Sequence, residues 1–149
     1  SGIMFRLNYA IDMRYGVLHD IATKVLAGET IDLGMGHVNV IWQGDAISQA
    51  LRSLAQCSAP MGAINVSGPE MLLVADLARS FGQRFGVDPL FTGEPARSAW
   101  LTNTAKSVSW FVKPVIGVDQ LIDWTADWLR RGQASLGKPT HYEARDGTY

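Results

Sequence analysis

The sequence has one cysteine, no long apolar run and no cluster of basic residues, and each of these absences excludes a class of protein. Cys57 cannot form an internal disulfide, which is typical of a reducing compartment, so we expect the cytoplasm. No apolar run approaches the roughly 18 residues that a membrane helix needs. The formal net charge is -1 and no basic stretch is long enough to follow a phosphate backbone, so we expect no nucleic acid partner.

The sequence instead alternates between helical and strand patterns, which is typical of an α/β domain. Its 149 residues, 47% of them hydrophobic, are enough to bury one sizeable core. Apolar residues at helical spacing predict helices over residues 17–26, 74–85, 104–111 and 118–131. A further helix is predicted after Asp45, whose carboxylate we expect to cap its N-terminus, with Ile47, Ala50, Leu51, Leu54 and Ala55 on one face. Strands are predicted over residues 3–11, 38–42, 63–66 and 90–92.

The predicted organisation is one mixed unit over residues 1–137 and a polar tail over residues 138–149, without internal repeats. In the tail, His141 and Glu143 alternate as metal ligands do, and Asp146 is near. Because the other histidines are far away in sequence, we expect a solvated or partner-packed tail and no metal site. The first strand pattern begins almost at the first residue, so we interpret the chain as a piece of a longer protein.

Five segments then follow one another in a recognisable order. They are RLNY at residues 6–9 with Tyr15 and Gly16, GETI at 28–31, VIWQGDAI at 40–47, NVSGPE at 65–70, and AKS at 105–107 leading to Pro114. In this order they resemble the extended short-chain dehydrogenase/reductases, above all the epimerase/dehydratase branch. The resemblance implies the C-terminal portion of a Rossmann-type protein, comprising the last sheet strands and the small substrate-binding subdomain.

By the same resemblance, the intact protein binds NAD or NADP and oxidises or epimerises a small carbonyl or hydroxyl compound. Two motifs for this chemistry are missing from the chain. None of the 15 glycines forms Gly-x-Gly-x-x-Gly or Gly-x-x-Gly-x-x-Gly, the loop that lets a pyrophosphate approach backbone amides. No Tyr-x-x-x-Lys is present, a pair in which the Lys ammonium lowers the pKa of the tyrosine toward neutrality. We therefore expect no catalytic residue here and no cofactor bound by this piece alone.

What the resemblance places in this chain is one side of the cleft. It implies that the turn after the first strand approaches the nicotinamide and the substrate, with Asn8 and Tyr9 as cofactor contacts. An alternative for Asn8 is that it satisfies backbone groups at the end of the strand. The predicted contacts to substrate are Arg14, Asn39, Trp42 and Arg97.

Two of these substrate contacts have structural alternatives. Arg14 can form a surface ion pair with Asp12, and Trp42 can belong to the core. Nucleotide-sugar members of the family commonly carry arginines that clamp the diphosphate, at positions that correspond to Val38 and Phe91 here. Neither residue is cationic, so a small hydroxy or keto compound stands beside a sugar-like compound as a predicted substrate.

Two functions remain open. One is a substrate-side fragment of an NAD(P)-dependent epimerase/dehydratase or oxidoreductase, inactive alone; the other is a non-catalytic binding or interaction module derived from the same fold. A fragment exposes the apolar edge and face of the strand at residues 3–11, so it self-associates or binds the missing N-terminal half. A module buries them and stays monomeric.

Overall fold

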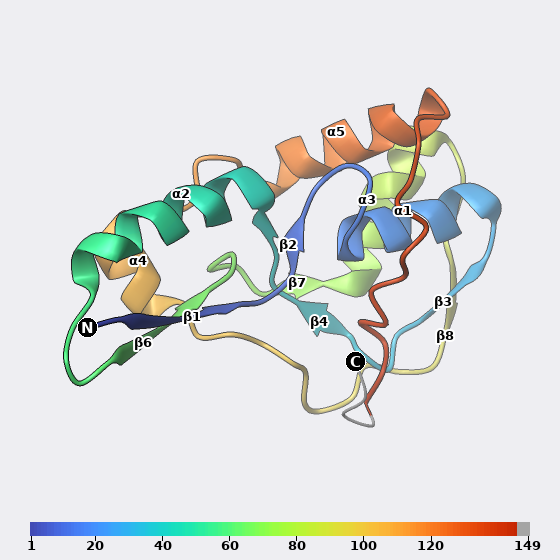
Figure 1. Cartoon of the computed structure of the whole chain (residues 1–149). Coiled ribbons are helices and arrows are strands. Elements are labelled where there is room, and N and C mark those ends of the chain that lie inside the picture. Colours follow the sequence, from blue (N-terminus) through green and yellow to red (C-terminus); the bar gives the residue numbers. More distant parts are fainter. Residues whose placement is uncertain (146–149) are drawn as a thin grey trace.

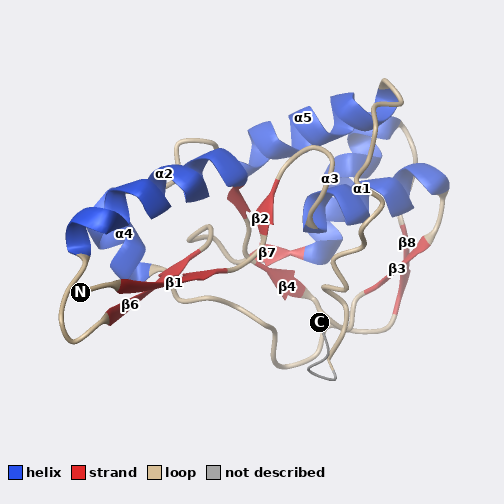
Figure 2. Ribbon diagram, in the orientation of Figure 1, coloured by secondary structure: helices blue, strands red, loops and turns tan. Residues whose placement is uncertain are grey.

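The computed structural model describes residues 1–145, which form short strands and five α-helices (Figures 1 and 2). The predicted α/β class is confirmed. Among residues 1–145, none of the helices could span a membrane. The elements are β1 (Ile3–Leu7), β2 (Ala10–Ile11), α1 (Val17–Ala27), β3 (Thr30–Asp32), β4 (His37–Val38), β5 (Ile41–Trp42), α2 (Gln43–Ser53), a 3-10 turn (Leu54–Gln56), β6 (Gly62–Val66), β7 (Leu72–Leu73), α3 (Val74–Phe85), β8 (Leu90–Thr92), α4 (Ala105–Phe111) and α5 (Val118–Arg130).

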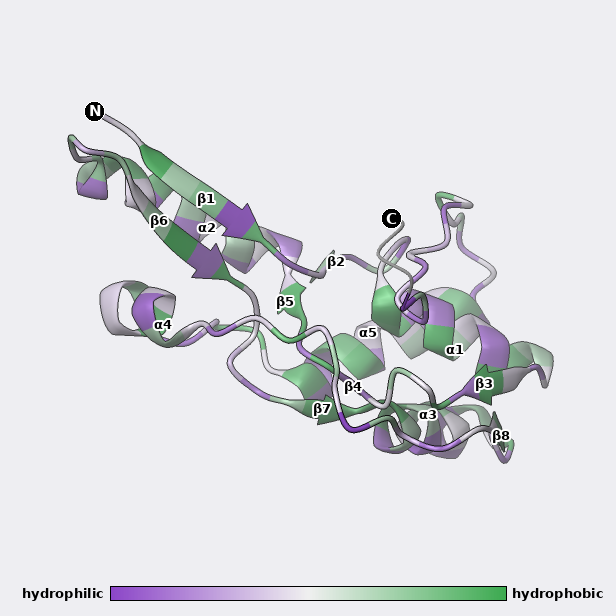
Figure 3. Cartoon of the chain, turned by 90° about the horizontal axis from the view of Figure 1, so that it is seen from below, coloured by the Kyte–Doolittle hydropathy of each residue, from purple (hydrophilic) through white to green (hydrophobic). Residues whose placement is uncertain are grey.

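The strands pair two by two. β1 runs parallel to β6, from Ile3 opposite Gly62 to Leu7 opposite Val66. β2 with β5 and β3 with β8 are also parallel pairs, whereas β4 and β7 are antiparallel. β1 and β6 lie side by side at one end of the molecule, away from β3 and β8 (Figures 1 and 3). Within residues 1–145 no strand pairs with the second edge of β1, so its backbone groups are available to another chain.

Two hydrophobic clusters hold these elements together. The larger lies between α1, α3 and α5, where Leu18, Phe81 and Leu121 are almost fully buried. The smaller joins β1 and β6 to α2 and α4, around Ile64 and Phe111. Burial of these apolar faces is the main stabilising contribution to the fold.

Helix ends in the larger cluster follow the sequence closely. α1 ends before Gly28, which has a φ of 67° and donates its amide to Lys24 and Val25. α3 ends in the same way before Gly86, at a φ of 73°. Glycine adopts this left-handed conformation without the steric cost that a Cβ brings, so both predicted helix ends are confirmed.

The predicted strand over residues 3–11 is two strands, because the chain turns at Asn8 and Tyr9. The amide of Asn8 still donates to Val66 of β6 at 3.0 Å, whereas the carbonyl of Tyr9 accepts from Ile41 of β5 at 3.1 Å. Tyr9 has a φ of 43°, and this left-handed residue redirects the chain from one partner strand to the other. The predicted strand over residues 38–42 is likewise divided, into β4 and β5.

The prediction that Asp45 caps a helix is wrong. α2 begins two residues earlier, at Gln43, and Trp42 occupies the N-cap position. Asp45 is buried in the first turn, where its Oδ2 accepts a hydrogen bond of 3.0 Å from the amide of Ile116. The carboxylate therefore fixes the loop before α5 against α2 instead of capping its own helix.

α2 also leaves its apolar face uncovered. The spacing correctly places Ile47, Leu51 and Leu54 together, but all three are exposed. Its buried residues are Asp45, Ala46, Gln49 and Ser53. This helix therefore turns a largely polar face inward and presents apolar surface to the outside, which is typical of a surface that another polypeptide covers.

The segment that the sequence marks as a polar tail packs onto α1 (Figure 1). Tyr142 is only 2% exposed and belongs to the larger cluster. Thr140 donates to Asp20 through its amide and its hydroxyl, and Lys24 forms an ion pair of 2.5 Å with Glu143. Residues 146–149 of the predicted tail, Asp146 among them, lie outside the described residues.

Close packing around Gly68 gives a test of the fold. A Cβ at Gly68 would lie 2.0 Å from the carbonyl oxygen of Val40, so the backbone must move to accept one. We expect Gly68→Ala to lower the free energy of unfolding by about 2 kcal/mol. Gly62→Ala is the matched control, because its Cβ would meet Ser58 Oγ at an ordinary 3.7 Å and should change stability by less than about 0.5 kcal/mol. Urea unfolding followed by tryptophan fluorescence measures both, and equal losses would contradict the packing described here.

Candidate functional site

A cavity of about 230 Å³ lies where β1 ends. Ligands of parallel α/β sheets bind beyond the carboxyl ends of the strands, so this position is the one that the fold favours for a binding site. We call it the strand-end cavity. Its lining consists of Leu7, Tyr9, Ala10, Tyr15, Gly16, Val17 and Thr140.

Two backbone conformations shape this cavity. Tyr9 holds a φ of 43°, which costs a non-glycine residue roughly 1 kcal/mol or more and is typical of ligand-binding segments. Gly16 has a φ of 118°, and a Cβ there would lie 2.5 Å from Ile11 Cγ2, so only glycine fits. Gly16 is also the N-cap residue of α1. The positive end of that helix dipole therefore lies beside the cavity and favours an electronegative group of a ligand.

One wall of the cavity comes from the C-terminal segment. Thr140 is held there by two hydrogen bonds to Asp20 Oδ2, 2.8 Å from its amide and 2.7 Å from its hydroxyl. Burial raises the pKa of Asp20, but the interactions with His19 and Thr140 outweigh it and hold the pKa below the ordinary value. Asp20 is thus a stable anion that anchors the wall to α1.

The predicted cofactor contacts lie at this site. Tyr9 lines the cavity, and Asn8 precedes it at the end of β1. The side-chain amide of Asn8 donates to Asn39 Oδ1 at a long 3.4 Å. This bond joins two side chains and involves no backbone group of the strand end, and Asn8 stays partly accessible.

Asn39, predicted as a substrate contact, is 4% exposed and fully engaged within the chain. Its Nδ2 donates to the carbonyl oxygens of Gly68 and Thr102, at 3.0 and 2.9 Å. Its Oδ1 accepts from the amide of Thr102 and from Asn8, at 3.2 and 3.4 Å. An asparagine amide has two donor and two acceptor positions, so this set uses all of them.

The other three predicted substrate contacts lie outside the lining of the strand-end cavity. Arg14 forms an ion pair of 2.7 Å with Asp12, as its alternative interpretation predicts. Trp42 packs against the larger cluster and meets Trp124 edge to face, with ring centroids 5.9 Å apart. Arg97 is exposed on the loop after β8. The structure therefore gathers Asn8, Tyr9 and Asn39 and leaves the remaining three apart from them.

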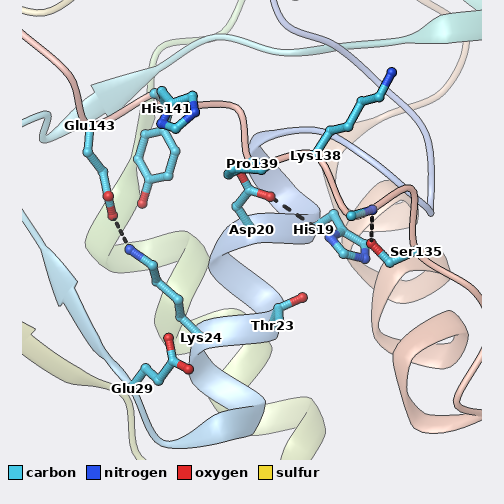
Figure 4. A pocket seen from close by; sticks show the side chains of 12 residues that line it. His19, Asp20, Thr23, Lys24, Glu29, Ser135, Lys138, Pro139, His141 and Glu143 are labelled. Atoms are coloured by element: carbon cyan, nitrogen blue, oxygen red, sulfur yellow. Dashed lines mark hydrogen bonds and ion pairs between the residues drawn. The ribbon is translucent and has the colours of Figure 1, made fainter.

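Of the seven residues that line the cavity, only Tyr9 was predicted as a contact, and Thr140 is the most distant of the others in sequence. It lies 120 residues after Asp20 and in a stretch without hydrophobic period, so no local pattern connects the two. The burial of Tyr142, two residues later, and the ion pair of Lys24 with Glu143 help to fix the segment in place (Figure 4). A lone tyrosine in a polar run is a weak signal in sequence alone.

Comparison with known proteins shows which fold the chain shares. No family model and no curated protein sequence matches the chain. Solved structures do match. The UDP-glucuronic acid 4-epimerase of Bacillus cereus in complex with NAD is 14% identical with a TM-score of 0.68, over 87% of this chain and 44% of that one. The UDP-glucose 4-epimerase of Thermus thermophilus in complex with NAD is 17% identical with a TM-score of 0.64, over 86% of this chain and 46% of that one. The enzyme WbmF of Bordetella bronchiseptica in complex with NADH is 13% identical with a TM-score of 0.65, over 87% of this chain and 46% of that one.

The chain shares their fold. The predicted likeness to the epimerase type of extended short-chain dehydrogenase/reductase is therefore confirmed as a likeness of fold. The chain spans less than half the length of each of these three structures. At 13 to 17% identity, activity and substrate do not transfer with the fold.

The two asparagines of the site differ sharply in their expected contribution to stability. Asn39→Ala leaves the buried carbonyl of Gly68 and the partly buried carbonyl of Thr102 without a donor, so we expect a loss of about 3 kcal/mol in the free energy of unfolding. Asn8→Ala removes one long hydrogen bond at a partly exposed position and should cost about 0.5 kcal/mol. Urea titration of the two variants measures the difference. An Asn39→Ala variant as stable as the original chain would contradict the structural use of Asn39.

Proposed function

We propose that this chain is the substrate-side part of an NAD(P)-dependent epimerase/dehydratase or oxidoreductase that acts on a sugar-like or small hydroxy or keto compound. The observation that carries the proposal is the likeness of fold to three dinucleotide complexes, each matched over less than half its length. The strand-end cavity supports it, because it lies at the sheet edge where such folds bind ligands. The reducing environment that suits Cys57 makes the cytoplasm the proposed location.

The residues present fit only one end of a dinucleotide. The strand-end cavity, at about 230 Å³, is smaller than the usual range for drug-sized ligands, and no glycine loop is present for a pyrophosphate. NAD or NADP, when bound to the intact protein, supplies the hydride acceptor and donor. Asn8 and Tyr9 are its proposed contacts from this chain, and they would hold and orient the nicotinamide end.

The four proposed substrate contacts differ in how accessible their side chains are. Arg14 and Arg97 have accessible guanidinium groups, which suit an anionic or hydroxylated compound. Asn39 and Trp42 would act by positioning, since both are packed within the chain. Neither Val38 nor Phe91 supplies the cation that a diphosphate clamp requires, so the proposal extends to substrates without a nucleotide.

Binding of NADH tests the proposal directly. In the chain alone we expect no energy transfer from its five Trp residues to the nicotinamide, because the pyrophosphate loop is absent. In a version extended at its N-terminus by a dinucleotide-binding half, we expect saturable transfer. The measurement is a fluorescence titration with excitation of tryptophan. Saturable transfer in the short chain alone would mean that the cofactor site is misassigned, and no transfer in either version would overturn the proposal.

The alternative of a self-contained binding module receives less support. Such a module buries the first strand, whereas β1 has an unpaired edge among residues 1–145 and exposes Met4 and Leu7. Ile3 and Phe5, on the opposite face from Met4, pack in the smaller cluster. The proposed partner is therefore a polypeptide that adds a strand to β1 and covers its outer face, either the N-terminal half or a second copy of this chain.

Self-association of the chain through β1 gives a further test. Met4→Lys places a charge on the uncovered face of an edge strand, which opposes strand addition. We expect it to weaken any concentration-dependent dimer by about tenfold, a change of roughly 1.4 kcal/mol. Leu136→Lys is the matched control, since Leu136 is 50% exposed and Met4 44%, but Leu136 lies in no strand. Sedimentation equilibrium distinguishes the two variants. Equal weakening by both would place the contact elsewhere.

A further inference from the structure

The loop between α4 and α5 presents apolar side chains to the outside. Val112 and Val115 are 71% and 85% exposed, and the exposed Lys113 lies between them in the sequence. Val112 has a φ of 68°, which is a strained conformation for a β-branched residue. Strained residues persist where the surrounding structure holds them, and they cluster at binding segments. We call residues 112–115 the valine loop.

Both ends of the valine loop are fixed by α2, which lies beside it (Figure 1). The guanidinium of Arg52 donates to the carbonyl oxygen of Phe111 at 3.1 Å and lies over the Phe111 ring, 5.1 Å from its centroid. At the other end, the amide of Ile116 donates to Asp45 Oδ2 at 3.0 Å. The loop is therefore held in place before a partner arrives, which lowers the entropic cost of binding.

A groove of about 450 Å³ lies where the first turns of α3 and α5 meet. Its volume is within the usual range of about 300 to 1,000 Å³ for binding sites. Leu77 and Ile122 form its buried apolar floor, whereas Met71 and Leu73 are 64% and 43% exposed along it. Apolar side chains that stay this accessible in a groove are typical of a surface that a partner covers. We call it the acidic groove, for the charges described next.

All charged side chains that line the acidic groove are carboxylates, namely Glu70, Asp76 and Asp119. Asp76 is paired with Arg79 at 2.8 Å. Glu70 and Asp119 take part in no ion pair within residues 1–145. Two unpaired carboxylates beside apolar surface favour a partner that carries a cation next to apolar side chains.

The valine loop has this chemistry, and it lies next to the groove. Lys113, flanked by the two exposed valines, forms no ion pair with any other described residue. Lys113 and Pro114 line a small cavity that shares Glu70, Gly117 and Val118 with the acidic groove. Because loop and groove are neighbours on one surface, a twofold axis between them lets two copies place each loop in the groove of the other, so that both contacts form at once.

We propose that two copies of this chain dimerise by this exchange, each valine loop packing in the acidic groove of the other copy. Lys113 of one copy pairs with Asp119 of the other, since Asp119 lines the groove but not the small cavity beside Lys113 of its own copy. Val115 covers Met71 and Leu73. The contact involves few side chains, so we expect a Kd of about 100 µM.

This interface goes beyond the function proposed above. The acidic groove shares no lining residue with the strand-end cavity, and no residue of β1 belongs to it. It requires neither a dinucleotide nor strand addition at β1.

Charge reversal tests the exchange, with sedimentation equilibrium as the measurement at chain concentrations up to about 500 µM. Lys113→Glu and Asp119→Lys each place like charges in both contacts, so each variant alone should raise the Kd about tenfold. An equimolar mixture of the two variants should dimerise as the original chain does, because both contacts of the mixed dimer then join opposite charges. Lys138→Glu and Asp88→Lys are the matched controls and should leave the Kd unchanged, since both residues are exposed and line neither the groove nor the small cavity.

Three results would overturn the inference. The first is an original chain that stays monomeric at about 500 µM, which would leave the groove to a different partner. The second is a mixture of the two charge variants that dimerises no better than either alone, because the contacts are then not reciprocal. The third is a dimer that Met4→Lys weakens and the charge variants do not, which would place the contact at β1.

A further variant covers the case in which a charge reversal prevents folding. Val115→Ser changes a side chain that is 85% exposed, so the core is not disturbed, and it should raise the Kd about tenfold. An unchanged Kd in this variant would contradict the packing of the loop in the groove. None of these results depends on NADH binding, so the two proposals can fail separately.

Discussion

The side-chain amide of Asn39 is the interaction on which the arrangement of this chain depends. It lies between β4 and β5 and binds the end of β1, the loop that follows β6 and the loop before α4. Its own carbonyl accepts from Ser67 Oγ at 3.0 Å, so the backbone is held as well as the side chain. Four segments that no continuous sheet joins are thereby connected through one buried residue. Each bond is individually modest, but all the side-chain bonds fail together when the amide is removed.

Asn39 matters because the chain has two cores instead of one. The larger cluster closes around α1, α3 and α5 and needs no further partner to bury Phe81. The smaller one is covered on one face only, with Ile3 and Phe5 inside and Met4 outside. α2 adds to this asymmetry, since its apolar face is turned outward. The closed cluster of α1, α3 and α5 and the half-covered cluster of β1 and β6 therefore meet near Asn39, and the half-covered one has the surface that a partner polypeptide requires.

Sequence alone predicted the helices of the larger cluster well and the segments around Asn39 poorly. Helices α1, α3 and α5 have strong apolar periodicity, so local rules sufficed. The predictions failed at Tyr9 and Asp45 because distant partners decide both conformations: Tyr9 joins two different strands, and the carboxylate of Asp45 meets the amide of Ile116, 71 residues away. At the candidate site, the family resemblance pointed to Asn8 in the turn after the first strand, whereas Thr140 depends on polar contacts that fold a remote segment back onto α1. Hydrophobic patterns report what a segment buries, and they do not report which distant polar groups it meets.

The C-terminal segment contributes to the strand-end cavity and to the larger cluster at the same time. Thr140 forms a wall of the cavity, and Tyr142, two residues later, is buried in the cluster. Asp20 accepts both hydrogen bonds from Thr140 and also faces His19, whose other nitrogen lacks a partner among residues 1–145. The wall of the strand-end cavity therefore depends on a single carboxylate of α1, which a segment about 120 residues later must reach before the cavity is complete.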